Sequence, residues 1–450
     1  MGCLSFERVP IDLDAYEERF NARLFDVEPI SEFTKQLRDS GSDVPAQFDL
    51  NDGISCAEAE VLALFYNSDL RIARLEAGVA LATRETAGLW EDPVFGFDGA
   101  KVFSPTSILE YGFMLGLTIP LSGRLGVEKD LASAAYEAEL HTIADLEWRT
   151  RANVRRHWSM WTASQAQSEL LMETIEELER IDAIADHLES SGELNRVQRR
   201  LIRIQVADMY VQASALDLKI VESEIALLQL IGLPTEALVF MTPGFPQMTT
   251  PEVDDVTARL IDSNTTLAMY FARYQTAEDT LRLEITKQFP DIVIGSGYGT
   301  QFNDQRVMFG LSVPLPILNA NRAPIARAHA EREVARAAAE ATFSEITRQL
   351  AAAEYSLNIK RKQRDRYAEE VIPLLAAQAQ DIQRIAALGE LDMFVLLETV
   401  NKTLRTKQEL IRLQAEELDA AITVVQILGP NNQFDHNTTG HRTLAPGDNP

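Results

Sequence analysis

Two segments of the chain alternate hydrophobic residues with small or polar residues at every second position. Within 109–120 the odd positions are large and apolar, whereas the even positions from 112 are glycine, methionine, threonine and proline. The segment 94–103 alternates in the same way, and the turn residues 104–107 separate the two. Because successive side chains of a strand point to opposite faces, both segments predict strands that face two different environments. A β-hairpin is therefore predicted at 94–120.

The same pattern returns near residue 300. Large residues alternate with glycines in 292–299, and 307–314 alternates again after a short polar loop. This predicts a second hairpin at 291–316. Runs of about ten alternating residues are typical of strands that cross a membrane. A hairpin packed on a soluble core shows the same alternation, so the pattern alone is compatible with both environments.

Long helices are predicted after each hairpin. Residues 124–187 contain no proline, and the second such segment begins near 325 and meets only Pro373 before about Leu388. Roughly sixty residues at about 1.5 Å each would span on the order of 95 Å. A helix of this length needs lateral partners, so coiled-coil packing is predicted. Each long helix is followed by a glycine turn and a return helix, and shorter helices are expected at 55–85 and 253–287.

The two halves of the chain repeat each other. Gly116–Leu121 reads Gly-Leu-Thr-Ile-Pro-Leu, and Gly310–Leu315 reads Gly-Leu-Ser-Val-Pro-Leu. Gly192-Glu193-Leu194 returns as Gly389-Glu390-Leu391, and the glycine that ends the first return helix, Gly232, returns as Gly429. The repeated unit is far longer than solenoid units of roughly 20–50 residues. The chain is therefore predicted to be a duplicated half-molecule.

This repeat predicts five regions. They are an extended N-terminal segment, 1–52; a first repeat, 53–232, with its tip near 190–194; a linker, 233–252; a second repeat, 253–429, with its tip near 388–392; and a disordered tail, 430–450.

Composition excludes several functions. The chain carries 42 Lys and Arg against 68 Asp and Glu, a net charge of −26, which argues against a nucleic-acid partner and is compatible with an acidic surface that favours cations. The sequence contains no run of 18 apolar residues, so no transmembrane helix is predicted. The motifs of zinc hydrolases and of serine hydrolases are absent. The glycine-rich segment 295–299 leads into another strand and not into the helix that a nucleotide site needs. No enzyme, cofactor or metal site is predicted.

Four strands in a bilayer would require several chains. A sheet edge exposed to lipid is not tolerated, and barrels built from one chain begin at about eight strands. If the hairpins enter a membrane, strands from other copies must close the sheet. Pro120 and Pro314 would then stand where each strand's hydrogen-bond ladder ends and a helix takes over, a place where proline is tolerated.

The duplicated order of helix, hairpin, very long helix, glycine turn and return helix resembles the TolC family of outer-membrane efflux channels, also called outer membrane factors. The resemblance covers roughly 55–429 and is most specific from Gly389 to Gly429. Gly310–Leu315 is similar to the family's strand-to-helix junction, which its first copy, Gly116–Leu121, repeats. The implied fold is mainly helical with a small β part. It is a homotrimer with a 12-stranded transmembrane β-barrel and a coiled-coil α-barrel.

The resemblance also implies partners and sites. The protein would lie in the outer membrane of a Gram-negative bacterium, extend into the periplasm, and work with a periplasmic adaptor and an inner-membrane pump. The adaptor would dock at the tips, at Gly192, Glu193 and Leu194 and at Gly389, Glu390 and Leu391. Alternatively, the two glycines simply allow the chain to turn.

Acidic residues close the pore of family members just past the second tip. Glu398 occupies one such position, Val395 replaces the other acid, and Asp392 is a substitute one turn earlier. A solvated helix face is the alternative for Glu398. Cys3 follows Gly2, which resembles the end of a bacterial lipoprotein signal, so Cys3 is a candidate for lipidation; otherwise it is a free cysteine without consequence.

The main hypothesis is therefore a passive exit channel of a tripartite efflux or type I secretion system, gated at its helical tips. The alternative is a soluble coiled-coil scaffold or adaptor protein of the periplasm, which would share the long helices but bury its hairpins in protein. The sequence does not distinguish drugs, metal ions or secreted protein as cargo.

Overall fold

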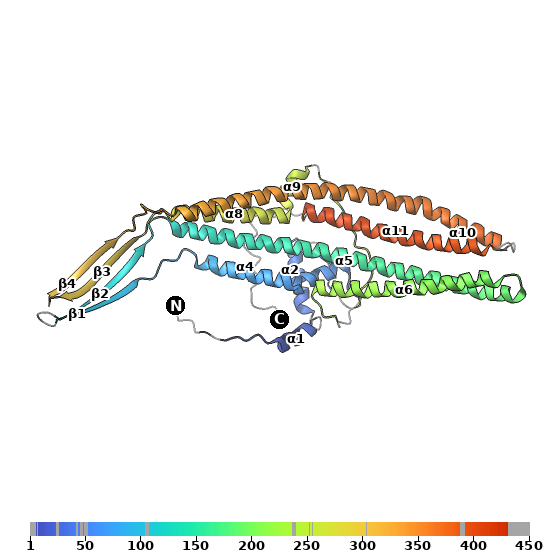
Figure 1. The fold of residues 1–450 in the computed structure, drawn as a ribbon, viewed down its shortest axis with the longest axis horizontal. Coiled ribbons are helices and arrows are strands. Elements are labelled where there is room, and N and C mark those ends of the chain that lie inside the picture. Colours follow the sequence, from blue (N-terminus) through green and yellow to red (C-terminus); the bar gives the residue numbers. More distant parts are fainter. Residues whose placement is uncertain are drawn as a thin grey trace.

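The chain folds into a long, narrow molecule with a small sheet at one end and helical turns at the other (Figure 1). The computed structural model describes residues 6, 8–23, 27–41, 44–45, 48, 53–103, 108–235, 240–251, 253, 255–302, 304–387 and 392–430. The two sequence halves run side by side along the length of the molecule. The predicted fold class, mainly helical with two hairpins and a duplicated half, is confirmed.

The sheet contains four antiparallel strands in the order of the sequence. They are β1 (Val94–Val102), β2 (Ile108–Ile119), β3 (Ile292–Gln301) and β4 (Asp304–Ser312). The two hairpins join through β2 and β3. Within the chain, β1 and β4 each pair on one side, so both outer edges of the sheet have no strand partner among the described residues.

The helical body begins directly after each hairpin. In the first half, α5 (Arg124–Ser191) is 68 residues long and α6 (Arg196–Ile231) returns beside it. In the second half, α9 (Arg322–Arg366), a π-helical turn η1 (Tyr367–Val371) and α10 (Ile372–Ala387) form the outgoing arm, and α11 (Met393–Leu428) returns. Helix α5 packs along α4 (Ser68–Thr86) and α6 of its own half, and along α8 (Thr265–Thr286) and α11 of the other half.

The outgoing arm of the second half continues through Pro373, with the π-helical turn η1 just before the proline. Proline donates no backbone hydrogen bond and its ring clashes with the carbonyl four residues earlier. A π-turn, which widens the helix by one residue, relieves that clash without ending the helix.

Each short helix before a hairpin is broken once, at an asparagine that the periodicity did not reveal. In the first half, α3 (Cys56–Tyr66) and α4 (Ser68–Thr86) meet at Asn67. In the second half, α7 (Val256–Ser263) and α8 (Thr265–Thr286) meet at Asn264. The single helices predicted at 55–85 and 253–287 are therefore helix pairs.

The N-terminal segment also departs from the prediction. It was expected to be extended, but it contains α1 (Leu13–Asn21) and α2 (Glu28–Asp39). The side chain of Asp12 accepts a hydrogen bond from the Ala15 backbone and caps α1. Ile30 and Phe33 of α2 are buried, and the Phe33 ring lies 5.3 Å from that of Phe65 on α3. Burial of these two side chains favours the helix, because both lie on one face of it.

Both asparagines join the start of one helix to the end of another. Asn264 Oδ1 accepts from the Leu267 backbone at 2.7 Å, and its Nδ2 donates to the Ile427 carbonyl at 2.6 Å. Asn67 repeats the arrangement in the first half, with Nδ2 donating to the Leu230 carbonyl at 2.9 Å. The amide has both a donor and an acceptor, so one side chain satisfies backbone groups of two helix ends. We call each of these asparagines a helix-end clamp.

Glycine follows the return helix at both clamps. Gly232 has φ of 87°, and a Cβ there would lie 2.6 Å from the Tyr66 carbonyl oxygen. Gly429 has φ of 75°, and its Cβ would lie 1.9 Å from the Ser263 oxygen. Both the left-handed conformation and the close approach of the backbone therefore require glycine.

Replacing Gly232 and Gly192 by alanine should separate these two requirements. Both residues have similar φ, 87° and 83°, but no atom lies within 4 Å of a Cβ at Gly192. Gly192→Ala should cost roughly 1–2 kcal/mol of stability, the strain of a left-handed residue. Gly232→Ala adds a backbone overlap and should lower the thermal unfolding midpoint of the detergent-solubilised protein clearly further. Equal midpoints would contradict the role of the helix contact.

Candidate functional site

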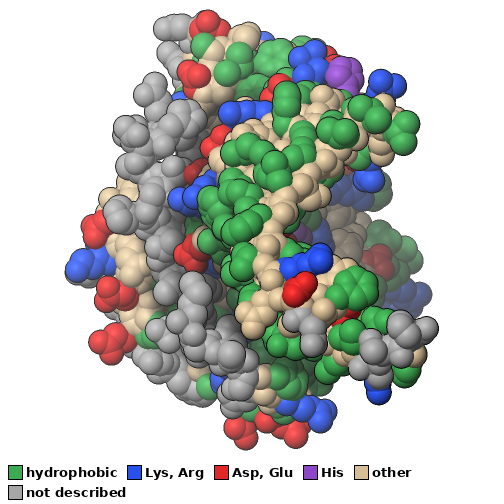
Figure 2. Space-filling view, turned by 90° about the vertical axis from the view of Figure 1, so that its left-hand side faces the viewer, with side chains coloured by type: hydrophobic (Ala, Val, Ile, Leu, Met, Phe, Trp, Pro, Cys, Tyr) green, Lys and Arg blue, Asp and Glu red, His purple; other side chains and the backbone are tan. Residues whose placement is uncertain are grey.

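One face of the sheet is a continuous exposed apolar surface. Side chains from all four strands contribute to it, and Phe309 is 83% exposed. Figure 2, seen from the sheet end, shows hydrophobic side chains crowded over the strands with few charges among them. Members of this apolar face are Phe95, Phe97, Leu109, Tyr111, Phe113, Leu115, Leu117, Ile294, Tyr298, Val307, Phe309 and Leu311. Such a surface on a chain of net charge −26 requires an apolar partner or solvent.

The opposite face carries small side chains, and strand pairing sorts them into rows. One row contains Val94, Gly116, Gly295 and Gly310, so the glycines of the repeated sequence flank a third glycine. The next row contains Gly96, Met114, Gly297 and Met308, and the one after it contains Asp98, Gly112, Gly299 and Arg306. We call this surface the glycine face. The two faces differ as the alternation predicts.

Arg124 fastens the sheet to the helical body. It opens α5, and its guanidinium reaches Glu91 at 2.9 Å, Glu128 at 3.0 Å and Asp291 at 3.0 Å. Burial alone would lower the pKa of Arg124, but hydrogen bonds and charges from these carboxylates outweigh burial and raise it. One side chain therefore ties together the segments that enter β1 and β3 and the helix that follows β2. Sequence reasoning missed this site because two of its three acids, Glu91 and Asp291, come from segments distant in the sequence.

The predicted junction prolines lie just beyond the strands. Pro120 is the first residue after β2, and Pro314 is the second after β4. The second junction is longer and ends at Asn321, which has φ of 54°. The Asn321 side chain donates to the backbone oxygen and carboxylate of Glu284 at 2.7 and 2.8 Å. Helix α9 is thereby held against α8.

The first predicted tip is a tight exposed turn. Gly192 ends α5 in the left-handed conformation, and the backbone N–H groups of Glu193 and Leu194 both donate to the Leu188 carbonyl. Asn195 then caps α6. The geometry explains the glycine as a turn residue, and docking at this tip stays a prediction. The second predicted tip residues, Gly389, Glu390 and Leu391, lie outside the described residues, as does Cys3.

The two predicted gate acids have different surroundings. Asp392 caps α11, because its Oδ1 accepts from the Phe394 backbone at 2.9 Å and from that of Val395 at 3.5 Å. Glu398 is exposed and forms no ion pair with another described side chain. Its neighbours Leu397 and Thr399 are buried, which fixes the direction of Glu398 away from the helix packing. Asp392 is thus engaged with the backbone, whereas the Glu398 carboxylate is free to face a lumen or a partner.

Two apolar residues accompany Glu398. Phe394 and Val395 lie one turn before it on α11 and are 70% and 44% exposed. Residues spaced by three or four positions share a helix face. The resemblance to the TolC family identified Val395 only as a residue that replaces an acid. It gave no sign that α11 presents a carboxylate beside exposed apolar side chains.

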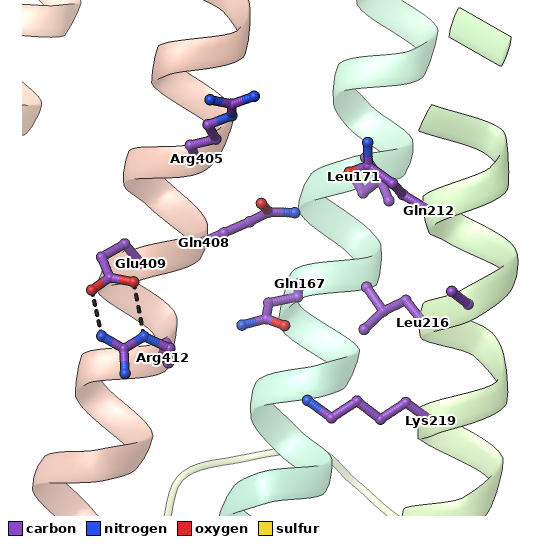
Figure 3. Close-up of a pocket in the computed structure, with 10 residues that line it drawn as sticks. Gln167, Leu171, Gln212, Leu216, Lys219, Arg405, Gln408, Glu409 and Arg412 are labelled. Atoms are coloured by element: carbon purple, nitrogen blue, oxygen red, sulfur yellow. Dashed lines mark hydrogen bonds and ion pairs between the residues drawn. The ribbon is translucent and has the colours of Figure 1, made fainter. Parts of the chain in front are cut away.

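A groove of about 570 Å³ lies between α5, α6 and α11, some twenty residues away from the tips along each helix (Figure 3). Glutamines and cations line it, and Gln408 extends from α11 toward α5. Arg412 donates to Glu409 Oε1 at 2.5 Å, and this hydrogen bond lowers the pKa of Glu409. The side chains that line this groove include Gln167, Gln212, Lys219, Arg405, Gln408 and Arg412. Sequence reasoning had no signal for it, because three separate helices supply its residues.

The described residues contain no group of three or more His, Cys, Asp or Glu side chains placed to hold a metal ion. Among the same residues, no helix is both long and apolar enough to cross a membrane.

Comparisons with known proteins place this geometry in a class. No family model matches the sequence. The cobalt-zinc-cadmium resistance protein CzcC of Cupriavidus metallidurans is 19% identical over 318 residues, 70% of this chain and 76% of that protein.

Solved structures of outer-membrane proteins have the same fold. The CmeC outer membrane channel of Campylobacter jejuni aligns with a TM-score of 0.70 at 14% identity, over 95% of this chain and 94% of that one. The outer membrane protein VceC of Vibrio cholerae aligns with a TM-score of 0.70 at 12% identity, over 83% and 96%. The chain therefore has the fold of outer-membrane channel proteins, which is the fold that the resemblance to the TolC family predicts.

Replacing Arg124 by alanine should loosen the join between sheet and helices. The change leaves three carboxylates without their shared cation, and we expect a loss of about 1–2 kcal/mol after solvent screening. Arg282→Ala is the matched control, because its pair with Asp130 is more than half exposed at both ends and should cost under about 0.5 kcal/mol. Thermal unfolding in detergent measures both. Equal losses would show that the three-acid arrangement has no special role.

Proposed function

We propose that the protein is the outer-membrane exit channel of a tripartite efflux system and not an enzyme. Three chains would each contribute four strands to a 12-stranded barrel, and their helices would form a tube through the periplasm. Solutes would pass by diffusion, and a partner pump in the inner membrane would supply the energy. The fold shared with outer-membrane channels supports this assignment.

The observation that carries the proposal is the sheet itself. It has an exposed apolar face, a glycine face and two free edges. In lipid, the backbone groups of a free edge have no water to bond, so the edges must pair with strands of other chains. A closed barrel would place the apolar face against lipid and the glycine face toward the lumen.

The helical body has the length that a periplasmic tube needs. The 68 residues of α5 correspond to about 100 Å at 1.5 Å per residue. A second face of this body also has no partner among the described residues, because α6 exposes Val197, Leu201, Ile204, Val211 and Leu218. Neighbouring chains of the trimer would cover these side chains, which supports lateral association of the helices.

The alternative function, a soluble coiled-coil scaffold or adaptor, has less support. It requires the apolar side of the hairpins to be buried in protein. No helix of the described residues covers that side, and Phe95, Phe97 and Phe309 are each more than 60% exposed. We therefore retain the channel as the proposal.

The tips would provide gating and docking. Exposed Glu398 from three chains would form a ring of carboxylates at the periplasmic entrance, with Phe394 beside it, and Asp392 would add charge while capping α11. A periplasmic adaptor would dock at the turns around Gly192 and Gly389. Lipid on Cys3 would anchor the chain to the membrane.

Replacing Glu398 by alanine should open the channel. The purified wild-type protein in planar lipid bilayers should give discrete, cation-preferring conductances. Glu398→Ala should raise the conductance and weaken the preference for cations, because a ring of negative charge attracts cations and obstructs the entrance. Glu17→Ala on α1, a helix without buried residues, is the control and should leave both unchanged. A verified trimer that remains silent in bilayers would contradict the channel proposal.

Metal cations are the cargo that the comparisons favour. The name of the related CzcC protein refers to cobalt, zinc and cadmium resistance, and the acidic charge of this chain suits cations. Deleting the gene from its host should therefore increase sensitivity to these metals, and the intact gene should restore resistance. Increased sensitivity to organic antibiotics alone would assign another cargo.

A further inference from the structure

Two methionines share one row of the glycine face. Met114 of β2 and Met308 of β4 both pair with Gly297 of β3, from its two sides. They are 45% and 38% exposed, so solvent reaches both side chains. The alternation had marked both residues only as members of the less apolar face.

Both side chains lie over the glycines between them. Met308 Cε is 3.5 Å from the positions that a Cβ would take at Gly297 and Gly299. Met114 Sδ is 3.8 Å from the corresponding position at Gly295. Any larger residue at Gly297 would meet the Phe113 carbonyl oxygen at 2.5 Å. The glycines thus leave a hollow along β3, in which Met308 extends over Gly297 and Gly299 and the Met114 sulfur lies nearer Gly295.

A carboxylate lies beside the same hollow. A Cβ built on Gly112 would lie 3.5 Å from Asp98 Oδ2 and 3.7 Å from Met308 Cε. Arg306 is in the Asp98 row, but Gly112 and Gly299 and their strands separate the two residues. The hollow therefore combines two neutral sulfur donors with the Asp98 carboxylate on the β1 side, whereas Arg306 lies on the β4 side.

We propose that Met114, Met308 and Asp98 form a binding site for a soft monovalent cation, Cu(I) or Ag(I). Thioethers are soft ligands that select such ions over zinc, cobalt, magnesium or calcium. Across Gly297 the two backbones are about 9–10 Å apart, twice the spacing of neighbouring strands. Two long, flexible methionine side chains on either side of Gly297 would bridge that distance by rotating toward one ion. The carboxylate offsets the charge of the ion.

The location of this site in a channel rests on the proposed function. In a closed trimeric barrel the glycine face lines the lumen, so three such sites would lie at one level of the exit path. They would bind soft cations at that level, while the glycines keep the path wide enough for other solutes. The site itself needs only the four-stranded sheet of one chain.

Methionine methyl NMR tests the proposal directly. The full-length protein, labelled with ¹³C at the methionine methyl groups and held in lipid nanodiscs, is titrated with Ag(I), a stable substitute for Cu(I). Met114→Leu and Met308→Leu assign the two signals. Met160 and Met172 of α5, 51% and 41% exposed, serve as internal controls. Reading methyl groups separates this site from any binding at cysteine.

The methyl signals of Met114 and Met308 should shift together at low Ag(I), while those of Met160 and Met172 stay in place. In each single methionine variant, the Ag(I) concentration that shifts the remaining methyl signal should rise at least about tenfold, because one of the two soft donors is gone. Asp98→Asn should weaken Ag(I) binding less than the loss of a methionine does. Zn(II) should not displace Ag(I) from the site. Shifts of equal size at all four methionines, or an unchanged Met114 response in Met308→Leu, would overturn the site.

Bilayer recordings then separate this inference from the channel proposal. Ag(I) should reduce the current of the wild-type channel and affect Met114→Leu/Met308→Leu much less. A conducting channel that Ag(I) blocks equally in both proteins would overturn the methionine site and leave the channel intact. Methyl shifts in a protein that forms no channel would support the site and contradict the exit-channel role.

Discussion

The whole helical body depends on satisfying backbone groups where helices end inside it. A helix end leaves several carbonyl and N–H groups without partners, and burying them unpaired is costly. Asn67 and Asn264 solve this twice, with one amide serving the start of α4 or α8 and the end of α6 or α11. Both asparagines are buried, at 8% and 3% exposure. From these two fixed points α4 and α8 extend toward the sheet, and α6 and α11 extend toward the tips (Figure 1).

Further groups strengthen the same region. The backbone oxygens of Gly429 and Pro430 accept hydrogen bonds from Arg259 of α7. In the first half, Arg23, two residues after α1, donates to the Gly232 carbonyl in the equivalent position. The N-terminal segment therefore supplies in the first half what the second half obtains from its own α7. This substitution explains why the N-terminal segment folds against the body and is not an extended strap.

The features that depend on local periodicity could be predicted from the sequence. Alternation located the four strands and both faces, and the absence of proline located α5. The clamps were missed because an asparagine in a continuous apolar pattern gives no periodic signal, although Asn67 and Asn264 occupy equivalent places in the repeat. The site around Arg124 and the methionine pair could not be predicted, because both require strand register and the packing of distant segments. Only the fold explains why these residues meet.

The two halves also differ in a way that duplication alone would not produce. Before η1, Arg361 and Arg364 form ion pairs with Glu417 and hold α9 to α11. After η1, Gln378 of α10 donates one hydrogen bond to Thr399 of α11. A π-turn adds one residue, and one residue corresponds to about 100° of rotation around a helix. The η1 turn thus resets the angular phase of α10, so the side chains that reach the second tip point in directions that α5 does not repeat. One extra residue in the second outgoing arm therefore rotates every side chain of α10 by about 100° relative to an uninterrupted α-helix.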